Sequence, residues 1–281
     1  MGTLYLVGTP IGNLDDITLR AVATLREVPR VAAEDTRRTR ALLSHLGIRG
    51  KALQSLDANA TESAIERAIQ WLCAGEDTAL VTDAGMPSIS DPGARLVQQA
   101  TARGIPVVVV PGPSAVTAAI AASGLVESTF LFAGFLPRKG EKRRSALRRL
   151  AATPEPIVLF EAPGRTHETL EQLAVNMPQR PVVVCRELTK LHEEIVRGTV
   201  AAVATREDWR GEVVLVLGPA PGANAPVRPH EEEQIAEIRR RLAKGQTSRE
   251  LAGELAALWH LPRRAVYALA LRVKSETSTP G

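Results

Sequence analysis

The hydrophobic pattern of the first 123 residues alternates short apolar runs with amphipathic stretches. The apolar runs predict five strands, at residues 3–7, 31–33, 52–54, 78–81 and 107–110. The stretches between them repeat their apolar positions with the period of an α-helix; in residues 61–72, for example, Ile65, Ala68 and Ile69 share one face. Short apolar strands that alternate with helices predict a mostly parallel sheet covered on both faces.

A second alternation of the same kind runs from residue 124 to residue 218. Three further strands are predicted, at residues 130–133, 157–160 and 182–185. Two last apolar runs, residues 193–197 and 213–217, are interpreted as a closing strand pair, so this second sheet is expected to be smaller and mixed. The predicted fold class is therefore α/β, with two domains.

The domain boundaries follow the changes in this pattern. We expect an N-terminal α/β domain at residues 1–123 and a C-terminal α/β domain at residues 124–218. Residues 219–229 are rich in Pro and Ala and are typical of a linker. Residues 230–275 are helical throughout, with a capping box at Thr247 and Glu250, and their last two helices resemble a helix-turn-helix.

The most constrained loop of the chain follows the fourth predicted strand. Residues 81–93 read V-T-D-A-G-M-P-S-I-S-D-P-G, a concentration of Gly, Pro, Asp and Ser. Open α/β sheets bind their ligands at the carboxyl ends of strands, so this loop is a candidate ligand site. The alternative is a stiff connection in which Asp91 caps the next helix. Similar loops follow the first and fifth strands, at residues 8–13 and 110–115.

Composition excludes several classes of function. The two cysteines, Cys73 and Cys185, are too far apart in sequence for a disulfide framework or a zinc site, and none of the five histidines has ligand spacing, so we expect no metal. A G-x-S-x-G nucleophile motif is absent. Prolines interrupt the longest apolar tract, residues 105–125, which argues against a membrane span. The formal net charge of +4 permits an anionic partner, and we expect a cytoplasmic protein.

Seven segments, in this order, resemble one family of enzymes. They read L-V-G-T-P-I-G-N-L-D-D-I-T-L-R-A, E-D-T-R, T-D-A-G-M-P-S-I-S-D-P-G, V-P-G-P-S-A, G-F-L-P-R-K-G, F-E-A-P-G-R and R-E-L-T-K-L-H-E-E. They resemble the ribosomal small-subunit methyltransferase I family, which belongs to the tetrapyrrole-methylase-like class of S-adenosylmethionine-dependent methyltransferases. One position departs from the family pattern, because Gly164 stands where a His is expected. We therefore expect this position to shape the loop and not to take part in catalysis.

The resemblance implies a fold, a reaction and a set of binding residues. It implies two α/β domains with S-adenosylmethionine in the cleft between them, a homodimer, and methylation of the ribose 2′-hydroxyl of a cytidine in small-subunit (16S) ribosomal RNA. The residues that it implies for the cofactor are Pro10, Asp83, Ala84, Gly85, Ser88, Ile89, Ser114, Ala115, Glu161, Leu188 and Thr189. The chemistry of the Gly- and Ala-containing turns in this set agrees with a role in cofactor binding, since such turns let the backbone approach a ligand closely.

A ribose hydroxyl is a weak nucleophile, so a general base would assist its methylation. Glu34 and Asp35, at the end of the second predicted strand, are the candidates. The alternative is that these carboxylates cap the following helix and form an ion pair with Arg37 or Arg38.

A basic loop and helix supply the candidate RNA contacts. These are Arg138, Lys139, Lys142, Arg143, Arg144, Arg148 and Arg149, and basic residues of the C-terminal tail are expected to add to them. The partner would be small-subunit ribosomal RNA or the small ribosomal subunit. Two other functions are kept as alternatives: a tetrapyrrole (precorrin-type) methyltransferase, and a non-catalytic RNA-binding protein.

Overall fold

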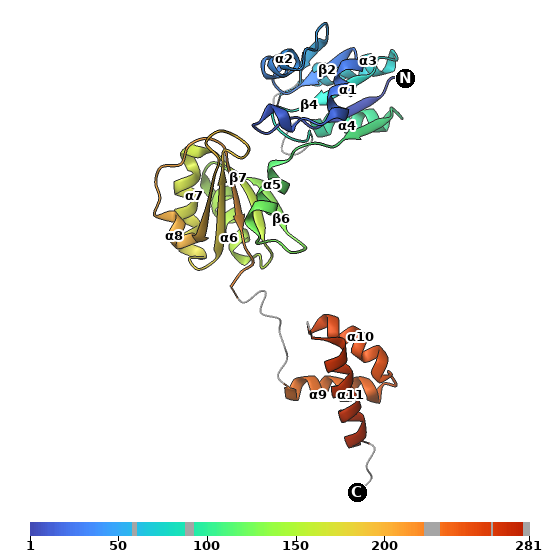
Figure 1. Cartoon of the computed structure of the whole chain (residues 1–281), viewed down its shortest axis with the longest axis vertical. Coiled ribbons are helices and arrows are strands. Elements are labelled where there is room, and N and C mark those ends of the chain that lie inside the picture. Colours follow the sequence, from blue (N-terminus) through green and yellow to red (C-terminus); the bar gives the residue numbers. More distant parts are fainter. Residues whose placement is uncertain (58–60, 88–92, 222–230, 260, 278–281) are drawn as a thin grey trace. The chain divides into compact units, whose positions relative to one another are not determined.

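The computed structural model of the protein describes residues 1–57, 61–87, 93–221, 231–259 and 261–277. The chain divides into two compact units, Met1–Ala220 and Pro221–Gly281. The first unit contains two β-sheets with their covering helices, and the described part of the second unit is built from three helices (Figure 1). None of the helices in these ranges is long and apolar enough to cross a membrane.

The first sheet is parallel throughout, as predicted. Its strands are β1 (Leu4–Val7), β2 (Arg30–Ala33), β3 (Ala52–Ser55), β4 (Thr78–Val81) and β5 (Val107–Val110), in the spatial order β3-β2-β4-β1-β5. The connections carry a short 3₁₀ turn, η1 (Leu14–Asp16), and the helices α1 (Leu19–Glu27), α2 (Thr36–His45), α3 (Glu62–Cys73) and α4 (Gly93–Ala102). Because all strands run the same way, the loops after β1, β2, β4 and β5 meet at one edge of the sheet.

Alternate strand residues build a core on each face of this sheet. Leu80 packs with Ile65, Ile69 and other residues of α3 and α4 on one face. Its neighbour Val81 packs with Leu25 and other residues of α1 and α2 on the opposite face. The predicted sheet with both faces covered is therefore confirmed.

The second sheet is mixed. Its strands are β6 (Leu131–Phe135), β7 (Ile157–Glu161), β8 (Pro181–Arg186), β9 (Glu194–Thr199) and β10 (Val213–Leu217), in the order β6-β7-β10-β8-β9. Only β6 and β7 are parallel. The expectation that the last two strands pair with each other is wrong, because β8 lies between them and is antiparallel to both.

Helices cover both faces of the second sheet. One face carries α6 (Gly140–Ala152), α7 (Pro163–Asn176) and the short α8 (Val200–Ala204), which share a core with β7 and β8. The other face carries α5 (Ala115–Ser123), whose Val116 and Ala119 pack with Val183 and Val214. The sequence pattern grouped residues 1–123 together, whereas the packing places α5 with the second sheet.

The C-terminal unit is a three-helix cluster. Its helices are α9 (Glu231–Ala243), α10 (Ser248–Leu258) and α11 (Arg263–Thr277). Ile238, Leu255 and Val266 are buried between them. The predicted capping box is present, since the Thr247 hydroxyl accepts a hydrogen bond from the Glu250 amide and the Glu250 carboxylate accepts one from the Thr247 amide. Most of the predicted linker, residues 222–229, lies outside the described residues.

Candidate functional site

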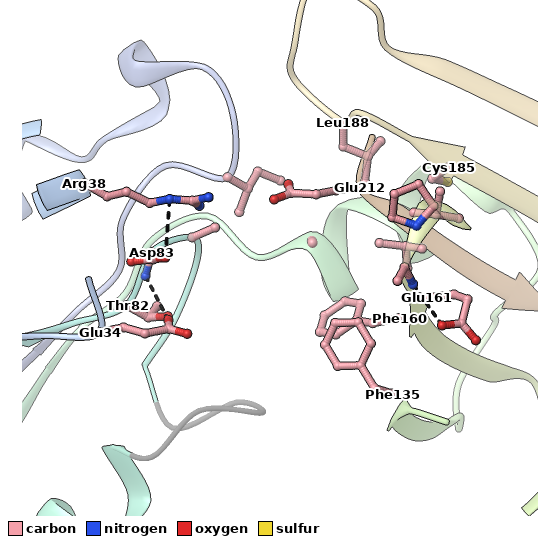
Figure 2. A pocket seen from close by; sticks show the side chains of 17 residues that line it. Glu34, Arg38, Thr82, Asp83, Phe135, Phe160, Glu161, Cys185, Leu188 and Glu212 are labelled. Atoms are coloured by element: carbon pink, nitrogen blue, oxygen red, sulfur yellow. Dashed lines mark hydrogen bonds and ion pairs between the residues drawn. The ribbon is translucent and has the colours of Figure 1, made fainter. Parts of the chain in front are cut away.

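A cleft of about 410 Å³ lies between the two sheets of the first unit (Figure 2). One wall, called here the first wall, is formed by Glu34, Thr82, Asp83 and Ala84, which follow the ends of β2 and β4. The opposite wall, called the second wall, comes from β6, β7, β8 and β10 and from the loops beside them. Its members include Phe135, Phe160, Glu161, Cys185, Leu188 and Val213. The first wall thus presents carboxylates, whereas the second wall is mainly apolar.

Two carboxylates of the first wall are linked through the β4 loop. Glu34 Oε2 accepts hydrogen bonds from the Thr82 hydroxyl at 2.5 Å and from the Asp83 amide at 3.1 Å. Burial raises the pKa of Asp83, and the nearby negative charge of Glu34 raises it further. Arg38 lies 3.5 Å from the Asp83 carboxylate and opposes this rise. Asp83 therefore holds its proton at a higher pH than an ordinary Asp, at a point where a ligand can reach it.

Asp35 is differently placed. Its carboxylate caps α2 by accepting a hydrogen bond from the Arg37 amide at 2.8 Å, and it forms an ion pair with the Arg37 guanidinium, also at 2.8 Å. These contacts lower the pKa of Asp35 to about 2. This geometry matches the capping and ion-pair alternative, and a carboxylate with such a low pKa is a poor proton acceptor.

Glu161, in the second wall, is held by a buried polar network. Its side chain is 0% exposed, and it accepts hydrogen bonds from the Thr169 hydroxyl at 2.7 Å and from the Ala162 amide at 2.8 Å. Arg165 lies 2.5 Å from one carboxylate oxygen, and Arg143 lies 3.8 Å from the other. The Glu161 carboxylate is thus fully engaged with protein groups, although the residue lines the cleft.

Glycines let the loops after β1, β5 and β8 approach one another closely. A Cβ at Gly8 would lie 2.7 Å from the Cα of Gly112, so the loops after β1 and β5 touch through their backbones. A Cβ at Gly12 would lie 2.6 Å from the Thr189 hydroxyl oxygen, which itself accepts a hydrogen bond from the Asn13 amide at 2.9 Å. The β1 loop is therefore in contact with the loop after β8.

The structure brings many of the predicted site residues to this cleft. Glu34, Asp83, Ala84, Ala115, Glu161 and Leu188 line it. Pro10 lines an adjoining hollow of about 300 Å³, together with Asp83 and Ala84. Gly85, at φ +86°, exchanges backbone hydrogen bonds with Thr9, and Ser114 is the N-cap of α5. Ser88 and Ile89 lie outside the described residues.

Sequence reasoning missed several residues that line the cleft. They include Arg38, Phe135, Phe160, Cys185 and Glu212. Phe135 and Phe160 do stand in two of the motifs quoted above, and both lie at the ends of strands, which is the signal that could have identified them. Gly164 lies in the first turn of α7, where a Cβ would meet nothing within 4 Å, so a larger side chain would fit there.

Six of the seven predicted RNA-contact residues are exposed on one loop and helix. Arg138, Lys139, Lys142, Arg144, Arg148 and Arg149 are exposed, and they are called here the basic surface. The seventh, Arg143, is only 4% exposed, and the expectation that it contacts RNA is wrong. Its guanidinium donates to Thr169 Oγ1 and Gln172 Oε1, both at 2.7 Å, because this position of α6 faces α7.

Within the described ranges, no group of three or more His, Cys, Asp or Glu side chains could hold a metal ion. The fold and the cleft define a methyltransferase of a known class, because the model of the Tetrapyrrole (Corrin/Porphyrin) Methylases family matches residues 3–204. Within that class, the chain belongs to the ribosomal RNA small subunit methyltransferase I family, as its relatives show. The predicted fold, enzyme class and S-adenosylmethionine dependence are confirmed at the level of these families.

Three relatives with the name Ribosomal RNA small subunit methyltransferase I illustrate the similarity. The protein of Bacillus subtilis is 42% identical over 277 residues, which cover 95% of this chain and 93% of the relative. The protein of Synechocystis is 43% identical over 282 residues, covering 98% of this chain and all of the relative. The protein of Thermotoga maritima is 46% identical over 220 residues, which cover 77% of this chain but 98% of the relative. That relative therefore has no counterpart to about a quarter of this chain.

Solved structures share the fold at low sequence identity. A diphthine synthase superposes with a TM-score of 0.62 at 17% identity, over 77% of this chain and 90% of that chain. A uroporphyrin-III C-methyltransferase from Thermus thermophilus, in complex with S-adenyl homocysteine, superposes with a TM-score of 0.57 at 22% identity, over 77% and 97%. These similarities support the two-sheet fold.

Proposed function

We propose that this protein transfers the methyl group of S-adenosylmethionine to the ribose 2′-hydroxyl of a cytidine in small-subunit ribosomal RNA. The observation that carries the proposal is the first wall of the cleft, where Asp83 combines partial exposure with a raised pKa. An apolar wall faces it across the cleft, and an exposed basic surface begins three residues after Phe135 of that wall. The names of the relatives support the same kind of RNA substrate.

The residues of the cleft fit S-adenosylmethionine, which when bound supplies a methyl group on a positively charged sulfur. Leu188, Val213 and Val214 offer apolar surface of the kind that holds an adenine ring. The Glu34 and Asp83 carboxylates lie on the opposite wall, and their negative charge suits a ligand that carries a sulfonium. The cleft volume of about 410 Å³ falls within the usual range for small-molecule sites.

Asp83 is proposed to accept the proton that leaves the ribose hydroxyl. Its raised pKa makes it a stronger base than an ordinary Asp, and its side chain is still 22% exposed to an incoming group. Glu34 is proposed to support this role in two ways. It fixes the β4 loop through its bonds to Thr82 and to the Asp83 amide, and its charge helps to raise the pKa of Asp83.

The basic surface is proposed to bind the phosphates of the RNA. Arg144 and Arg148 form ion pairs with Glu141 on their own helix, so a phosphate would compete with a single carboxylate for two guanidinium groups. Exposed ion pairs of this kind contribute little to stability, which leaves these side chains available for exchange. In the C-terminal unit, the exposed Arg263 and Arg264 at the start of α11 are proposed to add contacts.

A homodimer and a cytoplasmic location complete the proposal. β5 is at an edge of the first sheet, and its Val109 is 50% exposed, so this edge offers a surface to a second copy. Light scattering after size exclusion should give about twice the mass of the chain, and a mass equal to that of one chain would reject the dimer. The location follows from the substrate, because ribosomal subunits are assembled in the cytoplasm of bacteria such as those of the relatives.

The proposed reaction is tested by incubating the protein and labelled S-adenosylmethionine with naked small-subunit RNA and with assembled small subunits. We expect label on the ribose of one cytidine, found by nuclease mapping. Label on a base, or no label in either substrate, would contradict the proposal. A tetrapyrrole offered in place of RNA should accept no label, and transfer to it would favour the tetrapyrrole alternative.

A further inference from the structure

The chain is poor in aromatic residues, yet three of its four phenylalanines contact one another, and two of these, Phe135 and Phe160, line the cleft. Phe132 and Phe160 make an edge-on contact with ring centroids 5.2 Å apart, and Phe160 and Phe135 are tilted by 53° with centroids 5.4 Å apart. Phe135 is the outermost of the three and is 55% exposed. In Figure 2 the rings of Phe160 and Phe135 extend from the second wall toward the first. A large apolar ring held open to solvent in a cleft is available to a ligand.

An irregularity in β6 is what turns Phe135 into the cleft. Phe132 pairs with Val158, but Gly134 pairs with Leu159 and Phe135 with Phe160, so Ala133 is an extra residue. Gly134 has φ +61°, a left-handed conformation that suits glycine. The extra residue puts Phe135 on the same face as Phe132, although strict alternation would have placed it on the face of Ala133, toward α6 and α7. Bulges that redirect a side chain are over-represented next to active sites.

We propose that the exposed face of Phe135 is a stacking platform for the base of the nucleotide that is methylated. The inference rests on the proposed function, because it names how that same site holds its RNA. A base that has left its stack in single-stranded RNA is commonly held on an aromatic side chain. The exposed Arg138 and Lys139 lie within four residues of Phe135 in the chain. Phosphates bound by these two side chains would belong to nucleotides near the proposed platform. An alternative occupant of the ring is the adenine of the cofactor, and the experiment separates the two.

The experiment replaces the ring while keeping its bulk. Phe135→Leu retains an apolar side chain but removes the flat π-face, whereas Phe135→Tyr retains that face. Phe130→Leu is the matched control, since Phe130 is also exposed, at 40%, but precedes β6 at the opposite end of the strand from Phe135. For each variant we would measure kcat/KM for small-subunit RNA, the affinity for S-adenosylhomocysteine by calorimetry, and the thermal midpoint.

We expect Phe135→Leu to lower kcat/KM for RNA by about tenfold or more, which is the effect of removing one aromatic stacking partner. Phe135→Tyr should stay within about threefold of the unaltered protein, because the hydroxyl leaves the stacking face intact. Phe130→Leu should not differ. The affinity for S-adenosylhomocysteine should be the same in all four proteins. If Phe135→Leu does not fold, Phe135→Gln, which suits an exposed position, takes its place.

Three results would overturn the proposal. The first is an unchanged kcat/KM in Phe135→Leu. The second is a loss of affinity for S-adenosylhomocysteine of about tenfold, which would assign the ring to the adenine. The third is an absence of methyl transfer to RNA by the unaltered protein. That result would refute the proposed function, and with it the assignment of Phe135, before any variant is compared, so the two failures are distinguishable.

Discussion

Each wall of the cleft contains a carboxylate at the end of a strand, and the two carboxylates have opposite surroundings. Asp83, after β4, has a raised pKa, a carboxylate neighbour in Glu34 and one arginine at 3.5 Å. Glu161, at the end of β7, is completely buried, with hydrogen bonds and two arginines around its oxygens. Both residues line the same cleft.

This difference shows that position in a cleft does not decide what a carboxylate does. In the second wall the Glu161 oxygens are occupied by hydrogen-bond donors and two arginines, so this carboxylate holds the wall together. In the first wall the Asp83 carboxylate is partly desolvated and lies beside the negative charge of Glu34, so its pKa is raised and it is a stronger base than an ordinary Asp. The four predictions below test the contrast, beginning with the largest expected effect.

The stability of the second wall should depend on Arg143, the buried partner of Glu161. Arg143→Met leaves Glu161 with one arginine instead of two and removes the hydrogen bonds to Thr169 and Gln172. Breaking a buried pair in this way typically lowers the free energy of unfolding by about 3–5 kcal/mol, which urea denaturation would measure. Arg144→Met is the control, because its side chain is 65% exposed and only a small loss is expected. Equal losses in both variants would contradict the structural role of Arg143.

In the first wall, Asp83 should be needed for methyl transfer and not for the stability of the fold. Asp83→Asn cannot accept a proton, and we expect kcat to fall by about a hundredfold or more. The affinity for S-adenosylhomocysteine should change much less, as calorimetry would show. The matched variant is Asp35→Asn, which alters a helix cap and an ion pair and should keep kcat near that of the unaltered protein. If Asp35→Asn is the inactive variant of the two, the assignment of the base is wrong.

The influence of Glu34 on Asp83 should appear in the pH dependence of kcat. The reaction needs ionised Asp83, so the rate rises as the pH rises through the pKa of Asp83. The negative charge of Glu34 raises that pKa. Glu34→Gln removes the charge, lowers the pKa of Asp83, and should move the acidic limb of the profile to lower pH. A limb that stays in place, or moves to higher pH, would show that Glu34 does not act through Asp83.

The basic surface should give the smallest effect, visible in the salt dependence of RNA binding. Arg149→Gln removes one exposed cation from α6, and the slope of log affinity against log salt concentration should become shallower by about one. The control is Arg103→Gln, directly after α4, which removes an exposed cation that pairs with Glu66. An equal change in both variants would mean that net charge matters and not the basic surface.

The sequence determined those features that depend on neighbouring residues in the chain. Apolar periodicity located the strands of both sheets, and the rule that ligands bind at the carboxyl ends of parallel strands identified the loop at residues 81–93. Within that loop, the family resemblance selected Asp83 and Ala84, which line the cleft. The capping box at Thr247 is local in the same sense, since its partners are three residues apart. The names of the relatives agree with the family that the motifs indicated.

Only the tertiary structure decided how residues from distant segments share space. Arg143 belongs to a run of basic residues and nothing in that run marks it as buried, because its burial depends on α7, more than 20 residues further along. Phe135 reaches the cleft through a bulge that is defined by its pairing with β7. The spatial order β10-β8-β9 likewise depends on which strands pair along their edges, and the apolar pattern of a single strand does not specify its neighbours. Periodicity reports the face of an element that is apolar, whereas the partner of that face is chosen by the free energy of packing the whole chain.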